Sequence, residues 1–167
     1  MTIEEAIQEA IQLEGKVRDI YRGALKDIGD QTGKRVFKIL ADEEQSHLDY
    51  LERRFEEWKR SRTISVEKLT SAIPSPQVIE EEAARIGERV AGKGQGGEHE
   101  MLTRAFEVEL ETSEFYQRMA KELPPEGQKL FAGFVEIEEG HLALVRAELD
   151  YLTKTGYWFD MKEFDME

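Results

Sequence analysis

Apolar residues recur every three or four positions along most of this chain. In residues 2–29 they fall at Ile3, Ala6, Ile7, Ala10, Leu13, Val17, Ile20, Ala24 and Ile28. Residues 31–60, 98–122 and 126–154 repeat this spacing. Residues three or four apart share one face of a helix, so the pattern predicts four amphipathic helices. The connection within each pair is short, which predicts two antiparallel helical hairpins.

The remaining segments differ in character from these helices. Residues 61–97 hold Pro74 and Pro76 and end in the glycine-rich run AGKGQGG, with one short helix expected near 76–91. Strand patterns are weak throughout, so the expected fold class is all-α. We expect a single domain over 1–167, made of one hairpin at about 2–60, a crossover at 61–97, a second hairpin at about 98–154, and a short C-terminal tail at 155–167.

Charge and composition narrow the functional classes. The net charge of −13 argues against nucleic acid or an anionic membrane surface as a partner. The absence of cysteine excludes disulfides, zinc–thiolate sites and iron–sulfur clusters in this sequence. The first residues lack the pattern of a signal peptide, and no apolar run has the length of a membrane span, so a cytoplasmic protein is expected.

The two hairpins are related in sequence. LEGKVRDIY at 13–21 aligns with VELETSEFY at 108–116, and DEEQSHLDYL at 42–51 aligns with EIEEGHLALV at 136–145. The alignment superposes four pairs of polar residues: Glu14 with Glu109, Tyr21 with Tyr116, Glu44 with Glu138, and His47 with His141. A diverged internal repeat has therefore kept the same polar residues in both copies.

Six of these polar residues lie within the apolar stripes of their helices. Glu14 lies between Leu13 and Val17, and the Glu-x-x-His pair of residues 44–47 lies between Leu40 and Leu51. The second hairpin repeats this placement, so all six are expected to point into the core: Glu14, Glu44, His47, Glu109, Glu138 and His141. Charged or polar neighbours off the stripes are expected at the surface: Glu43, Gln45, His99, Glu111, Glu114 and Glu139.

Four carboxylates in one core need compensation, because removing each from water costs several kcal/mol or more. They could be protonated, paired with basic side chains, or bound to cations. No lysine or arginine occupies the stripes near the glutamates. Two divalent metal ions would balance four glutamates, and each histidine would add a nitrogen ligand. Mixed carboxylate and imidazole ligands favour iron or manganese.

One glutamate followed by Glu-x-x-His, present twice, is the ligand pattern of di-iron carboxylate bundles. On these residues the sequence resembles the ferritin and rubrerythrin superfamily over roughly 1–60 and 98–154, and is most similar to small rubrerythrin-related proteins. The resemblance implies a ferritin-like four-helix bundle that binds two iron ions, with manganese as an alternative. It further implies bridging by Glu44 and Glu138, and one metal ion at each histidine. Tyr21 and Tyr116 would then hydrogen-bond the ligand carboxylates beside the reacting centre.

The resemblance implies two functions. The first is a redox enzyme that acts on hydrogen peroxide or O₂ and is re-reduced by a separate electron donor such as a rubredoxin, because the cysteines of a rubredoxin domain are absent. The second is a ferroxidase that handles iron. Rubrerythrins carry a further glutamate where this chain has Thr112, and often a glutamate at the position of His141, so the ligand set is closer to that of bacterioferritin. A bundle in which the metal ions are only structural is a third possibility.

The C-terminal tail is aromatic and acidic. Tyr157, Trp158 and Phe159 follow one another in it. Because three adjacent aromatic side chains are expected to be covered, the sequence predicts a homodimer or another contact at this end.

Overall fold

The computed structural model describes residues 1–87, 96–155 and 158, and throughout these ranges its regular structure is helical. The five helices are α1 (Ile3–Ala24), α2 (Gln31–Ser61), α3 (Pro76–Gly87), α4 (Gly96–Glu122) and α5 (Pro125–Thr155). The predicted all-α class is therefore confirmed.

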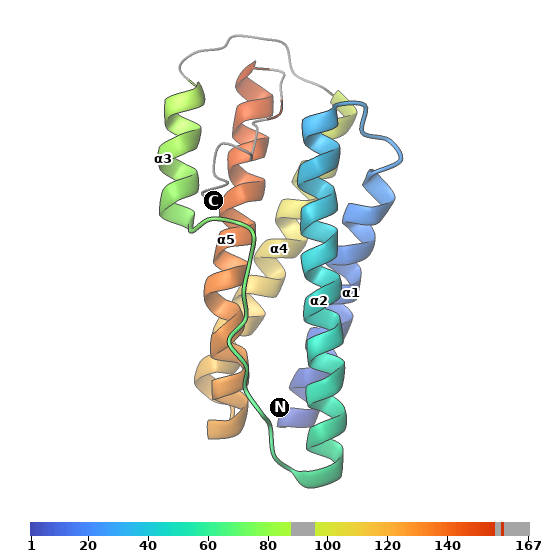
Figure 1. Ribbon diagram of the computed structural model, residues 1–167, viewed down its shortest axis with the longest axis vertical. Coiled ribbons are helices and arrows are strands. Elements are labelled where there is room, and N and C mark those ends of the chain that lie inside the picture. Colours follow the sequence, from blue (N-terminus) through green and yellow to red (C-terminus); the bar gives the residue numbers. More distant parts are fainter. Residues whose placement is uncertain (88–95, 156–157, 159–167) are drawn as a thin grey trace.

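The long helices run along the long axis of the molecule (Figure 1). Helices α1 and α2 form one antiparallel hairpin and α4 and α5 form the other, while α1 also packs on α4. The crossover leaves the lower end of α2, runs up the molecule between α2 and α5, and leads into α3, which packs on α5. The crossover thus covers one face of the space between the two hairpins.

The helix ends follow from local sequence. The Thr2 hydroxyl accepts a hydrogen bond from the Glu5 N–H at 3.1 Å, and the Glu5 carboxylate accepts one from the Thr2 N–H at 2.9 Å. This reciprocal pair is a capping box at the start of α1, and it satisfies two otherwise unpaired donors. Asp30 caps α2 through the Gly33 N–H. Helix α5 begins at Pro125. Proline has no backbone N–H, but the first residue of a helix has no intrahelical acceptor for one, so no hydrogen bond is lost.

Side chains of α2 tie the crossover to that helix. We refer to residues 62–75 as the strap. The Arg54 guanidinium donates to the Ser65 carbonyl at 2.6 Å, and the Glu67 N–H donates to the Tyr50 hydroxyl at 3.1 Å. The Ser65 hydroxyl donates to Glu57 at 2.7 Å. These side chains lie about one to two turns apart on α2, so the strap is fixed along the helix rather than only at its ends.

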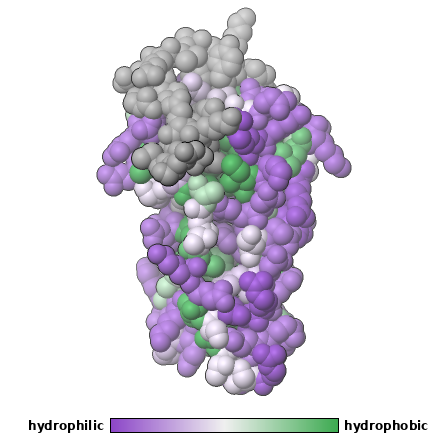
Figure 2. All heavy atoms as spheres, viewed as in Figure 1, coloured by the Kyte–Doolittle hydropathy of each residue, from purple (hydrophilic) through white to green (hydrophobic). Residues whose placement is uncertain are grey.

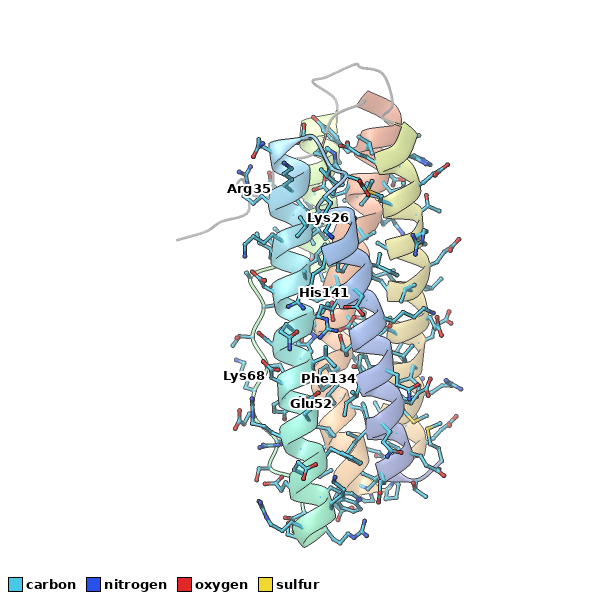
Figure 3. The ribbon with its side chains drawn as sticks, turned by 90° about the vertical axis from the view of Figure 1, so that its right-hand side faces the viewer. Lys26, Arg35, Glu52, Lys68, Phe134 and His141 are labelled. Atoms are coloured by element: carbon cyan, nitrogen blue, oxygen red, sulfur yellow. The ribbon has the colours of Figure 1, made fainter. Side chains whose placement is uncertain are left out.

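The apolar core has two parts with a polar layer between them. The lower part includes Leu13, Leu51 and Phe134, whereas the upper part includes Val17 and Leu40. Between these levels lie buried carboxylates and imidazoles from α1, α2, α4 and α5. Figure 3 shows His141 between the helices, above Phe134 on the same helix. The apolar layers on both sides shield the polar layer from water.

The one described residue of the tail is buried. Trp158 is 5% exposed, packs edge-on against Phe37, and donates its indole N–H to Glu98 at 2.7 Å. Its own chain therefore covers this ring, which removes one reason for expecting a partner there. Tyr157 and Phe159 lie outside the described residues, and the homodimer stays a prediction.

Most of the face shown in Figure 2 is hydrophilic. Apolar residues on it gather mainly in a narrow band over the crossover and α5, with a smaller group toward the upper right of the view. Within the described ranges, no helix has both the length and the apolar character that crossing a membrane requires.

The position of Trp158 generates a stability prediction. A Cβ atom at Gly33 would lie 2.5 Å from the Trp158 ring, whereas one at Gly23 would meet open space. Gly33→Ala should lower the free energy of unfolding by about 1–3 kcal/mol through overpacking. Gly23→Ala, the matched control, should raise it by about 0.5–1 kcal/mol, because alanine is the better helix former. Thermal or denaturant unfolding measures both, and equal shifts would contradict the packing of Trp158 on Gly33.

Candidate metal centre

The six predicted core residues come together at one level of the structure. Ligand atoms of Glu14, Glu44, His47 and Glu138 lie within 4.8 Å of one another, and so do those of Glu44, Glu109, Glu138 and His141. All six side chains are buried, with at most 3% of any residue exposed. Glu44 and Glu138 belong to both groups, so the cluster has two adjoining positions for a cation with two shared carboxylates.

Helix geometry explains this assembly. Each Glu-x-x-His places its two side chains on one helix face, and residues 44–47 and 138–141 face each other across the layer. Glu14 and Glu109 enter from the neighbouring helices α1 and α4. The two imidazole rings stack with centroids 5.6 Å apart. The repeat in sequence thus becomes an approximate twofold arrangement of ligands.

The distances from His47 Nδ1 to the neighbouring carboxylates match the spacing of atoms that bind one cation better than the length of direct hydrogen bonds. Its Nδ1 lies 3.6 Å from Glu14 Oε1, 3.5 Å from Glu44 Oε2 and 3.5 Å from Glu138 Oε1. These separations are too long for good hydrogen bonds. Ligand atoms that share one metal ion at about 2.1 Å, with angles of about 90–110°, lie about 3.0–3.5 Å apart.

At the second cation position, around His141, one pair of ligand atoms already lies in direct contact. His141 Nδ1 lies 2.6 Å from Glu44 Oε1 and 3.6 Å from Glu109 Oε1. Glu138 Oε2 is 4.0 Å away. Here the imidazole and Glu44 share a hydrogen bond, which would have to open for both to bind the same ion.

Several buried polar atoms of the cluster have no hydrogen-bond partner among the described residues. They are Glu14 Oε2, Glu44 Oε2, His47 Nδ1, His47 Nε2, Glu109 Oε2, Glu138 Oε1 and Glu138 Oε2. Leaving such atoms unpaired costs about 1–3 kcal/mol each, and more when they are charged. No lysine or arginine is among the buried polar residues that the structure describes. A pair of divalent cations would satisfy these atoms, so the donor set fits a two-metal site.

Each tyrosine contacts a carboxylate of the other hairpin. The Tyr21 hydroxyl donates to Glu109 Oε1 and the Tyr116 hydroxyl to Glu14 Oε1, both at 2.5 Å. Both tyrosines are fully buried, and burial together with these carboxylates raises the pKa of each phenol well above its ordinary value. The phenols therefore remain protonated donors, and each fixes one carboxylate oxygen.

Without metal ions the cluster balances its charge with protons. Burial and the neighbouring Glu14 raise the pKa of Glu44 to about 8, and burial with Glu44 raises the pKa of Glu138. Burial alone would raise the pKa of Glu14, but its neighbours Glu44 and His47 outweigh burial and lower it to about 2. For His47 and His141, burial opposes the charged form, yet nearby carboxylates prevail and raise each pKa well above its usual range.

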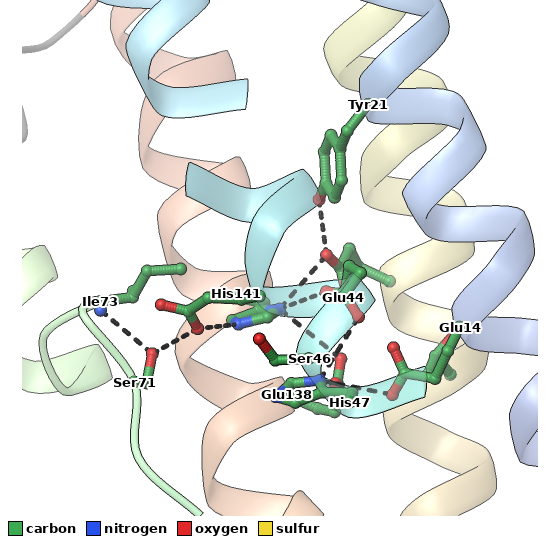
Figure 4. Close-up of polar contacts among 12 residues, drawn as sticks. Glu14, Tyr21, Glu44, Ser46, His47, Ser71, Ile73, Glu138 and His141 are labelled. Atoms are coloured by element: carbon green, nitrogen blue, oxygen red, sulfur yellow. Dashed lines mark hydrogen bonds and ion pairs between the residues drawn. The ribbon is translucent and has the colours of Figure 1, made fainter. Parts of the chain in front are cut away.

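One site residue was wrongly expected at the surface. The Glu43 side chain is 13% exposed, and its Oε1 lies 2.9 Å from His141 Nε2 (Figure 4). Glu43 points away from the stripe of its own helix but toward α5 and the strap, and periodicity on one helix carries no information about that neighbour. As expected, His99, Glu111, Glu114 and Glu139 are exposed, whereas Gln45 is half-buried.

Thr112, at which the resemblance implied the loss of a further glutamate, adds no ligand to the cluster. It is fully buried, and its hydroxyl donates to the Val108 carbonyl at 2.8 Å. Its side chain is thus engaged within its own helix and adds no carboxylate to the cluster.

Comparison of this chain with protein-family models, with curated proteins and with solved structures gives no significant match. The function of this chain is therefore inferred from the geometry of the cluster alone.

Metal affinity should fall steeply as the pH is lowered. The raised pKa values mean that His47, His141, Glu44 and Glu138 carry protons near neutral pH in the metal-free protein. Ligand atoms must lose these protons to bind metal, so loading should release about two protons per ion. The association constant should then drop by up to about a hundredfold per ion for each pH unit below the Glu44 pKa of about 8.

Isothermal titration in buffers of different ionisation enthalpy measures this proton release directly. A cluster that binds Co²⁺ with the same affinity at pH values of about 6 and about 8 would contradict the protonation states given above.

Proposed function

We propose that this chain is a two-metal carboxylate protein that holds two iron ions, or manganese in their place, and reduces peroxide or O₂ with electrons from a separate donor. The observation that carries the proposal is the pair of buried four-residue groups that share Glu44 and Glu138. Unpaired carboxylate and imidazole atoms within these groups support it.

We further propose that the fold is a ferritin-like four-helix bundle. Two antiparallel hairpins joined by one long crossover support this assignment, since that connectivity distinguishes ferritin-like bundles from simple up-and-down bundles. The level of the ligand cluster, between two apolar layers in the middle of the helices, supports it as well.

Residues of each hairpin would divide the ligands between the two ions. Glu14 and His47 would bind one ion, Glu109 and His141 would bind the other, and Glu44 and Glu138 would bridge them. When bound, a pair of iron ions would supply the redox chemistry with O₂ or peroxide.

The protein's own contribution is positioning and exclusion of water. Tyr21 and Tyr116 each donate a hydrogen bond to one glutamate, so that carboxylate keeps its other oxygen for the metal. Rings of Phe134 and Tyr116, which stack 4.8 Å apart, close the layer below the cluster. A dry, fixed ligand set favours controlled redox chemistry over free exchange with solvent.

Elemental analysis and mutation test the ligand assignment. The wild-type protein reconstituted with iron should hold about two ions per chain, from the ligand count. Glu44→Ala or Glu138→Ala should abolish binding of both ions, because each is shared by both groups. His47→Ala should remove chiefly one ion. The exposed Glu139→Gln is a matched control and should retain both. Equal and small losses in all variants would argue against bridging.

Stopped-flow mixing tests the reaction. The ferrous protein should react faster with hydrogen peroxide than with O₂, and should then stall until an external reductant arrives. The stall follows because the sequence has no cysteine and therefore no iron–sulfur electron source of its own. Faster reaction with O₂, together with growth of a ferric mineral, would instead indicate a ferroxidase that handles iron. No reaction with either oxidant would indicate a structural metal site.

A further inference from the structure

Glu43 joins the strap to the metal cluster. Its Oε1 accepts a hydrogen bond from the Ser71 hydroxyl at 2.7 Å, and its Oε2 accepts one from the Ala72 N–H at 2.8 Å. The same Oε1 lies 2.9 Å from His141 Nε2. The carboxylate is thus held from two sides by the strap while it contacts an imidazole of α5. Figure 4 shows this chain of contacts from Ser71 to the ring.

His141 is fixed at both ring nitrogens by these contacts. Its Nδ1 faces Glu44, Glu109 and Glu138, while its Nε2 faces Glu43 outside the ligand cluster. A carboxylate acceptor at Nε2 keeps a proton on that nitrogen, so Nδ1, which shares a hydrogen bond with Glu44 in the metal-free protein, is the nitrogen that can exchange its proton for a metal. Glu43 therefore selects both the ring orientation and the tautomer that metal binding needs.

The other histidine has no equivalent contact. In the repeat, Glu43 aligns with Ile137, which offers no acceptor. Nε2 of His47 is buried and has no hydrogen-bond partner among the described residues, and its ring meets the edge of Phe134 at 5.3 Å. The strap crosses only one side of the molecule. The ligands of the two hairpins are therefore related by an approximate twofold axis, but the residues around them are not.

We propose that Glu43 is a positioning residue for His141 and that, through the strap, it makes the two metal positions unequal, with the position at His141 binding more tightly and filling first. This inference rests on the proposed two-metal function. An oriented imidazole loses less freedom on binding and is a more basic ligand because its N–H faces a carboxylate. His47 has no such contact at its Nε2 among the described residues.

Titration of the metal-free protein with Co²⁺, followed by visible absorption and by calorimetry, tests this inference. The wild-type protein should fill in two steps whose affinities differ by at least about tenfold, or about 1.4 kcal/mol. Glu43→Ala should weaken the tighter step by about 10–100-fold and leave the other within about threefold. Glu43→Gln keeps an acceptor oxygen at the same reach and should recover part of the loss.

Two further variants separate positioning from general damage. Ser71→Ala removes an exposed strap hydroxyl that donates to Glu43 and accepts from the Ile73 N–H, and should weaken the same step by a smaller factor. Glu139→Gln removes a neighbouring exposed charge without contact to either ring and should change neither step. Two equal steps in the wild-type protein, or equal weakening of both steps by Glu43→Ala, would overturn the inference while leaving the two-metal function intact. A wild-type protein that binds no Co²⁺ would overturn both.

Discussion

Four carboxylates buried in one layer are the constraint on which this structure depends. Glu14, Glu44, Glu109 and Glu138 are each fully buried, and no lysine or arginine lies among the buried polar residues that the structure describes. In a low-dielectric core such a group is stable only with protons or bound cations. The two apolar layers, the facing Glu-x-x-His pairs and the crossed tyrosine contacts all accommodate this layer. A core made only for stability would be simpler with apolar residues at these positions.

Much of the fold and of the ligand set follows from sequence periodicity. Three of the long helices lie within two residues of the predicted ranges, whereas α1 ends at Ala24, five residues before the predicted end. Amphipathic spacing and caps such as Thr2 and Asp30 are local signals, which is why most of these ends follow from sequence. The six cluster residues were identifiable because a polar residue within an apolar stripe has to enter the core. Glu43 was missed because its partners, Ser71 and His141, are 28 and 98 residues away along the chain. The path of the crossover creates those contacts, and its sequence has no periodic pattern from which the path could be predicted. The burial of Trp158 likewise depends on a distant residue, because its ring occupies the space beside Gly33.

Duplication explains the symmetry of the ligands but not of their surroundings. Both hairpins supply the same ligand types, so the two positions begin as chemical equivalents. The chain has only one crossover, however, and its strap lies over the side where His141 meets Glu43. Ile137 at the matching place in the second hairpin lines a cavity of about 550 Å³ beneath the strap instead of making a polar contact. The surroundings of the two positions therefore differ most clearly where the connection between the repeats meets Glu43.

The tyrosine contacts also couple assembly of the two hairpins to the cluster. Tyr21 of the first hairpin holds Glu109 of the second, and Tyr116 of the second holds Glu14 of the first. Each hairpin by itself would lack the partner of its own tyrosine and of its own glutamate, so these groups would face water instead of each other. The hairpins therefore have to dock before the ligand geometry exists, and ligands shared between them, such as Glu44 and Glu138, make metal binding favour the docked state. Under the proposed two-metal function, the charge that makes this core unfavourable without metal ions would also make their binding stabilise the fold.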